Sequence, residues 1–299
     1  MHRSSRRRFV VTAGAVVATV TAGCTGVLDG DDSTDGNGGD GNGDDENGDG
    51  GNGDGDGGPT AELPAHADWL AADLLRSDND EAGFFYIDVQ RVLAEWPEDA
   101  QREFEIEGMA AELGVEPEDL EGMVVLERSG EFGPQMTLAV TGSFDKDALV
   151  AELSDGMETE THGEYEVIME QIAVGADAVV IGDEYASLLD AHTGEIDRIA
   201  DTDEEWDAAM RYVAGAGLSG VIYEADEDHE LMGVAMDAEN GDVAVEAYVH
   251  FEDAETAEAE QAEAEADAEE EFVEGGEIHE VSVDANVVIV EGTIHDFEW

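Results

Sequence analysis

Two parts of this chain carry the same pattern of apolar residues about a hundred residues apart, and this internal repeat restricts the possible folds. Residues 135–144 (QMTLAVTGSF) correspond to 242–251 (DVAVEAYVHF), and residues 165–183 correspond to 278–293. The aligned positions include Phe144 and Phe251, at an offset of 107 residues. A repeat of this length predicts two related structural units. We expect them to span about residues 84–183 and 220–294.

Each unit is expected to consist of antiparallel hairpins and a helix. Apolar residues recur at every second position of 243–251, which predicts a half-buried strand. Short loops such as Glu239-Asn240-Gly241 favour hairpins over crossover connections. A leading strand precedes each unit's first hairpin, at residues 84–88 and 220–224. The sequence therefore predicts an α+β fold of two related hairpin-helix-hairpin units, with antiparallel sheets and helices packed on one face.

Periodicity places the unit helices at residues 145–153 and 254–271, and further helices at 96–113, 184–191 and 203–213. The segment 254–271 (AETAEAEQAEAEADAEEE) has alanines at positions 257, 264 and 268 and is otherwise mostly acidic. Like charges three and four residues apart destabilise a helix by a few tenths of a kcal/mol per pair. This helix is thus expected to need salt screening and close packing through its alanines.

The charge balance indicates the solvent for which the chain is adapted. There are 78 acidic residues against 11 Lys and Arg, and the formal net charge is −67. Molar salt shortens the Debye length to about 3 Å and permits such dense like charge. The acidity is therefore interpreted as an adaptation to high salt. A nucleic-acid partner is not expected, because phosphate contacts need Lys and Arg.

The N-terminus has the three parts of an export signal. A basic start is followed by the apolar run 9–22 and by a small-residue site that ends at Cys24, the only cysteine. Arg6 and Arg7, followed by Phe9, resemble the twin-arginine export motif. Residues 21–24 (TAGC) resemble a lipobox, in which Cys24 is lipidated after cleavage. The alternative is an uncleaved anchor or a buried helix, with Cys24 an ordinary thiol.

These features divide the chain into residues 1–23, a signal peptide; 24–60, a tether; and 61–299, the folded domain. The tether consists almost wholly of Gly, Asp and Asn, which cannot bury enough apolar surface to order. The signal, the acidic tether and the acidic domain together resemble the exported lipoproteins of halophilic archaea. That resemblance implies a lipid-anchored protein on the outer face of the cell membrane, and it supplies no catalytic residues.

One polar stripe is a candidate ligand site. Glu246, Tyr248 and His250 share the face of one strand opposite its apolar side, and they could bind a cation or another ligand. The alternative is a solvated strand face, since outward faces of antiparallel strands are commonly polar. The pairs His279-Glu280 and His295-Asp296 lack metal-ligand spacing and are interpreted as edge-strand residues. The sequence predicts no catalytic residue, metal site or cofactor.

We therefore expect a non-enzymatic binding or structural module, anchored to the membrane through lipid at Cys24. A surface protein or a surface-layer lattice is a possible partner, and the oligomeric state is open. The first alternative is a solute-binding lipoprotein of a transporter, which would need two lobes around a cleft. The second, an extracellular hydrolase, would need His and carboxylates gathered in a closed pocket.

Overall fold

The structure is a computed structural model, and it describes residues 62–75, 82–130, 133–154, 157–224, 230–239, 241–271 and 276–295. The predicted signal peptide, with Arg6, Arg7 and Phe9, lies outside the described residues, as do Cys24 and the predicted tether. Within the described ranges, no helix is both long enough and apolar enough to cross a membrane.

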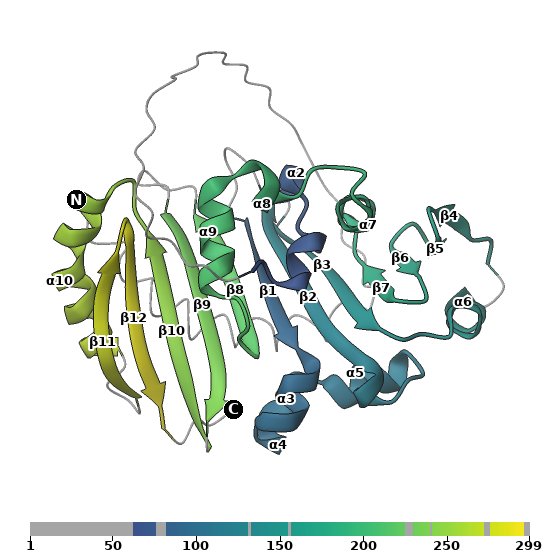
Figure 1. Ribbon diagram of the computed structural model, residues 1–299. Helices are drawn as coiled ribbons and strands as arrows, with labels where there is room; N and C mark the ends of the chain where they lie inside the picture. The colour runs from purple at the N-terminus through teal and green to yellow at the C-terminus, as the bar shows by residue number, and fades with distance from the viewer. Residues whose placement is uncertain are drawn as a thin grey trace, which may run out of the picture.

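A single twelve-stranded sheet forms the body of the molecule (Figure 1). Its strand order is β11-β12-β10-β9-β8-β1-β2-β3-β7-β6-β5-β4, and all neighbouring strands are antiparallel. The strands are β1 (Ala82–Asp88), β2 (Leu120–Gly130), β3 (Gly133–Gly142), β4 (Glu160–His162), β5 (Tyr165–Ile168), β6 (Ile172–Val174), β7 (Ala178–Ile181), β8 (Leu218–Glu224), β9 (Glu230–Glu239), β10 (Asp242–His250), β11 (Gly276–Asp284) and β12 (Val287–Ile294). The expected antiparallel α+β class is confirmed.

The two leading strands predicted from the sequence lie side by side at the centre of the sheet. Strand β1 pairs with β2 on one side and with β8 on the other, with Phe85 opposite Gly220. A Cβ atom at Gly220 would lie 2.4 Å from Cδ1 of Phe85, so only glycine fits beside that ring. This seam between β1 and β8 joins the two halves of the chain into one sheet.

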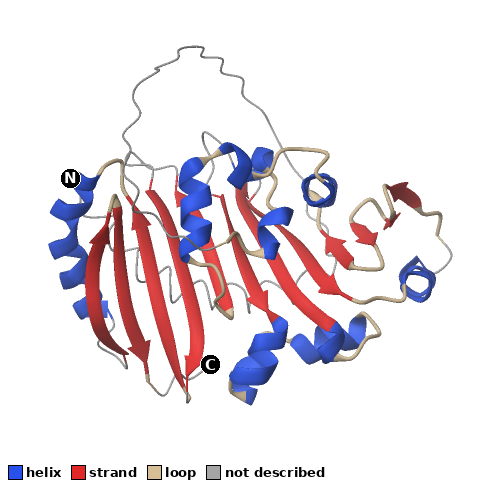
Figure 2. Cartoon of the chain, viewed as in Figure 1, coloured by secondary structure: helices blue, strands red, loops and turns tan. Residues whose placement is uncertain are grey.

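Helices cover both faces of the sheet, so the expectation that they pack on one face is wrong (Figure 2). Successive side chains of a strand point to opposite faces. Phe84 accordingly joins one buried cluster and Phe85 the other. The helices are η2 (Ala65–Trp69), α2 (Ala72–Leu75), α3 (Val89–Glu95), α4 (Glu98–Glu103), α5 (Ile106–Glu112), η3 (Pro117–Asp119), α6 (Lys146–Ser154), α7 (Tyr185–Thr193), α8 (Ile199–Thr202), α9 (Glu204–Tyr212) and α10 (Ala254–Glu271).

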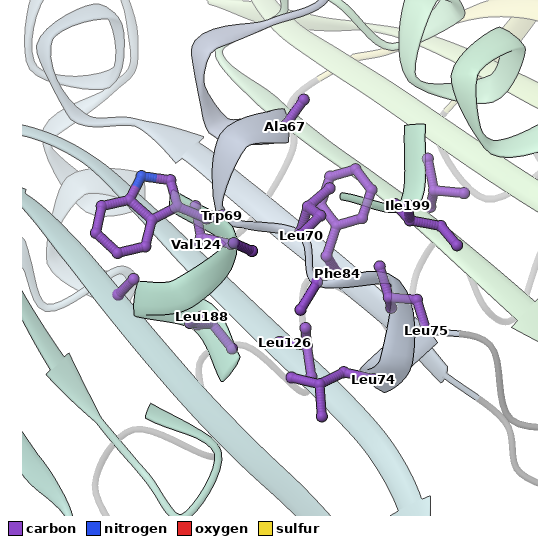
Figure 3. Close-up of a cluster of buried hydrophobic side chains, with 14 of the residues drawn as sticks. Ala67, Trp69, Leu70, Leu74, Leu75, Phe84, Val124, Leu126, Leu188 and Ile199 are labelled. Carbon is purple, nitrogen blue, oxygen red and sulfur yellow. The ribbon is translucent and has the colours of Figure 1, made fainter. Parts of the chain in front are cut away.

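The first buried cluster lies beneath η2, α2, α7, α8 and α9. Figure 3 shows part of it, with Trp69 and Leu70 beside Phe84 of β1 and Leu188 of α7. The second cluster lies on the opposite face, beneath α3, α4, α5 and α6. Both faces of the central strands are therefore buried. In these strands an alternation of residues between two faces does not mean that one face is exposed to solvent.

The single helix expected over residues 96–113 is divided into α4 and α5. Glu105 separates them with a left-handed backbone, φ 49°. On either side of this break Phe104 and Ile106 are buried in the second cluster. The chain thus accepts an unfavourable backbone conformation at Glu105 where two large side chains enter the same core.

Helix α10 has the bounds predicted from the sequence and packs against β11 and β12 at one end of the sheet (Figure 1). Ala257 is fully buried against the sheet, and Ala264 is half-buried. The Gln261 side-chain amide donates to the Val281 carbonyl oxygen at 2.8 Å. The side chain of Ala268 lies outside the described residues. A small apolar contact therefore holds a strongly acidic helix in place.

We predict that α10 unfolds before the sheet when salt is removed, because its glutamates then repel one another without screening. Hydrogen exchange followed from molar salt down to about 0.1 M should show protection lost first in α10. Ala262→Lys, which places a lysine four residues after Glu258, should lower the salt that the helix needs, whereas the uncharged control Ala262→Gln should not. Simultaneous loss of protection in α10 and β12 would contradict the prediction.

Candidate functional site

The predicted stripe on β10 is buried at two of its three positions. Tyr248 is 3% exposed and His250 5% exposed, whereas Glu246 is exposed. The cause is α9, which packs over β9 and β10 on this face and brings Tyr212 above the stripe. A solvated strand face is therefore the wrong interpretation for Tyr248 and His250. It holds for Glu246 alone.

Tyr212 connects three elements that are far apart in the sequence. Its ring centroid lies 4.9 Å from that of Tyr248 and 5.9 Å from that of His250, both on β10. Its hydroxyl donates to Oδ2 of Asp284, at the end of β11, at 3.0 Å. We call Tyr212, Glu246, Tyr248, His250 and Asp284 the Tyr212 cluster. It spans α9, β10 and β11.

Both tyrosines of the cluster donate to carboxylates. The Tyr248 hydroxyl donates to Glu246, as the Tyr212 hydroxyl does to Asp284. Burial, reinforced by these hydrogen bonds, raises the pKa of both phenols. Each phenol therefore stays protonated at neutral pH and fixes the orientation of its carboxylate.

His250 is the unusual member of the cluster. Both of its ring nitrogens are buried, and neither has a hydrogen-bond partner among the described residues. Burial lowers the pKa of His250 to about 4, so the ring is neutral at pH 7. A neutral imidazole has one N–H donor and one nitrogen acceptor, and buried groups of this kind are nearly always hydrogen-bonded. His250 can therefore offer one donor and one acceptor to a small polar ligand.

A second buried histidine provides a comparison. Both ring nitrogens of His66 also lack a partner among the described residues, and burial lowers its pKa to about 3. Its ring stacks on Tyr86 at 4.0 Å and lies 5.4 Å from the Phe84 ring. Those aromatic contacts hold His66 against Phe84 and Tyr86 in the first buried cluster, which also includes Tyr248.

Two more histidines connect helix α7 to its neighbours, and the sequence analysis did not single them out: His192 lies on α7 and His162 lies on β4. The ring of His192 stacks on Trp69, with centroids 3.8 Å apart, and its Nε2 lies 3.8 Å from Oδ2 of Asp177. His162 Nε2 lies 2.6 Å from Oδ1 of Asp190. Each pair joins residues distant in the sequence, so no local spacing marks it. These contacts attach α7 to η2 and to the smaller strands.

The histidine pairs near the C-terminus are held by neighbouring strands. His279 Nε2 lies 2.7 Å from the Thr293 hydroxyl oxygen, and His295 Nδ1 lies 3.2 Å from Oδ1 of Asp242. No group of three or more His, Cys, Asp or Glu side chains suited to holding a metal ion occurs among the residues that the structure describes.

No known protein family matches the chain. None of the curated proteins is similar to it in sequence. Solved structures described as crystal forms I, III and IV of TP0453 are similar to it at 12–13% identity, with TM-scores of 0.43, 0.42 and 0.41. The match covers 78–79% of this chain and 94–95% of that one. At these scores the likeness supports no conclusion about function.

We predict that the two buried histidines make the fold sensitive to acid. In the unfolded chain the pKa of a histidine is about 6.5, whereas in the folded chain the pKa of His250 is lowered to about 4. The unfolded state therefore binds more protons between these values, and the free energy of unfolding falls as the pH is lowered through this range, by up to about 3 kcal/mol for His250. Denaturant titrations from pH 7 to pH 4 measure this slope. His250→Phe should reduce the slope, and an unchanged slope would contradict the assignment.

Proposed function

We propose that this protein is a lipid-anchored binding module on the outer face of the membrane of a halophile, without enzymatic activity. The anchoring is supported by Arg6, Arg7 and Phe9 in an export signal that ends at Cys24. The excess of acidic residues supports the proposal that the protein works in high salt. A diacylglycerol-type modification at Cys24 would anchor the chain firmly, because two acyl chains bind a membrane far more tightly than one.

The observation that carries the binding function is His250. Burying a polar group without a partner costs free energy, and the neutral ring of His250 has two such groups. Beside it, Tyr212 and Tyr248 each position a carboxylate. The half-buried Asp284 and the exposed Glu246 make the side of the cluster that faces solvent anionic. The proposed ligand is therefore small and polar, accepts from and donates to His250, and carries a positive charge toward these carboxylates.

We further propose that the two halves of the sheet are related units. From the seam outward, one half runs β1-β2-β3-β7 and the other runs β8-β9-β10-β12. A helix follows the third strand of each half, α6 after β3 and α10 after β10. The same order on both sides supports a duplicated unit. Because the sheet continues through the seam, this arrangement favours a single module over the two lobes of a solute-binding lipoprotein.

The anchor is tested in the native host. We expect the wild-type chain in the membrane fraction, and Cys24→Ala in a form released by washing, because the lipid attachment site is lost. Replacing both Arg6 and Arg7 by lysine should retain the protein inside the cell. If Cys24→Ala stays in the membrane fraction as the wild type does, the lipid anchor is disproved.

Binding is tested with matched histidine variants. The purified chain is incubated in molar salt with a small-molecule extract of the host cell surface, and retained compounds are identified by mass spectrometry. The wild type and His66→Phe should retain the same compound, and His250→Phe should lose it. His250→Phe should also be more stable at neutral pH, by about 1 kcal/mol, because it removes buried polar groups without partners. Equal retention by all three chains would contradict the assignment of the site to His250.

A further inference from the structure

One arginine of the sheet has no carboxylate partner in a chain that is rich in carboxylates. There are 78 acidic residues against 11 Lys and Arg, so a basic side chain readily finds an acidic one. Ion pairs of this kind join Arg91 to Asp237, Lys146 to Glu166, Arg198 to Asp68 and Arg211 to Asp207. Arg128 differs from these. Its Nε is buried without a hydrogen-bond partner, and no carboxylate of the described residues pairs with it.

Arg128 lies near the end of β2, on the face of the sheet that carries the first buried cluster. Leu126, two residues earlier on the same face, is buried in that cluster beside Leu74 of α2 (Figure 3). Gln135 of β3 lies directly opposite Arg128 in the register of the two strands. Directly opposite residues point to the same face, with Cβ atoms about 5 Å apart. Arg128 and Gln135 are both half-buried, so each side chain is also accessible to solvent.

The chemistry of the guanidinium group defines the partner that Arg128 lacks. This group stays charged at neutral pH, and it has five N–H donors and no acceptor. Its planar fork matches the two oxygen atoms of a carboxylate, and such a bidentate pair is stronger than a hydrogen bond between neutral groups. The carboxamide of Gln135 supplies a further N–H donor on the same face. Leaving a buried charged donor unpaired costs free energy, which a bound carboxylate would recover.

We propose that Arg128 and Gln135 form a binding site for the carboxylate group of a small organic anion. One carboxylate oxygen accepts from Nε of Arg128, and the other accepts from a terminal N–H of the same guanidinium. The Gln135 amide donates to the oxygen that lies toward β3. This site is independent of the ligand proposed for His250, because β2 and β10 lie on opposite sides of the seam and the two ligands carry opposite charges.

The negative charge of the whole chain does not prevent an anion from binding at Arg128. In molar salt the Debye length is about 3 Å, so distant carboxylates are screened and the contacts within the site decide the affinity. Chloride is the competing anion under these conditions. A carboxylate is favoured over chloride because its two oxygen atoms engage two donors of the planar fork at once.

Arginine side-chain NMR tests the site directly. The full chain is labelled with ¹⁵N at arginine, and sodium acetate replaces sodium chloride at constant molar salt. The Nε–H signal of Arg128, assigned by its loss in Arg128→Lys, should shift and saturate, whereas the signals of Arg198 and Arg211 should not, because carboxylates already pair with them. An Arg128 signal that does not respond to acetate, or a shift shared by all arginine signals, would overturn the proposal.

Matched variants test the role of Gln135. Gln135→Glu supplies the missing carboxylate, so it should raise the melting temperature and abolish the acetate response. Thr161→Glu adds the same charge on the exposed face of β4 and should leave the response unchanged. Gln135→Leu removes the amide donor, so it should raise the acetate concentration at half-saturation at least about fivefold. A response in Gln135→Glu as strong as in the wild type would place acetate elsewhere and overturn the assignment.

Discussion

The pairing of β1 with β8 is the contact on which the rest of the structure depends. It joins a strand that begins one half of the chain to a strand that begins the other, and the sheet extends outward from this seam on both sides. Close approach of the two strands requires glycine: a Cβ atom at Gly83 would lie 2.8 Å from the Val221 carbonyl oxygen. Without the seam the chain would form two smaller sheets, and β1 and β8 would each become an exposed edge strand.

The seam also determines where this strongly acidic chain buries the apolar side chains that stabilise its fold. Charged groups are costly to bury and remain near water. The chain's one cysteine lies in its N-terminal segment, outside the described sheet, so a disulfide within the sheet does not stabilise the fold. The fold is therefore stabilised by apolar burial on the two faces of the sheet. The central strands contribute to both buried clusters, with Phe84 in one and Phe85 in the other. The outlying elements have less to bury. Helix α10 is one example, because Ala257 is its one fully buried side chain among those described.

The sequence predicted the local elements well and their packing poorly. Period-two alternation located the hairpin strands, and α10 has the predicted bounds, because both depend on residues close in the chain. Three features were not predictable in this way: the helix break at Glu105, the helices on both faces, and the burial of Tyr248 and His250. Each depends on contacts between distant segments, such as the hydrogen bond from Tyr212 to Asp284, 72 residues apart. A polar stripe on a strand looks the same in sequence whether water or a helix covers it.

Local rules fail at several places in the described part of the chain, among them the left-handed backbone of Glu105 and the unpartnered ring nitrogens of His66 and His250. At His250 the chain buries an imidazole where an apolar side chain would stabilise the fold, and at Met169 and Glu170 it keeps a turn that Asn-Gly would form more easily. His250 and the Met169-Glu170 turn lie in opposite halves of the sheet, on opposite sides of the seam. Consistency between local preference and global fold is what makes a chain fold reliably, and departures from it concentrate at functional positions. Because the continuous sheet supplies the stability, each half can carry such departures without loss of the fold.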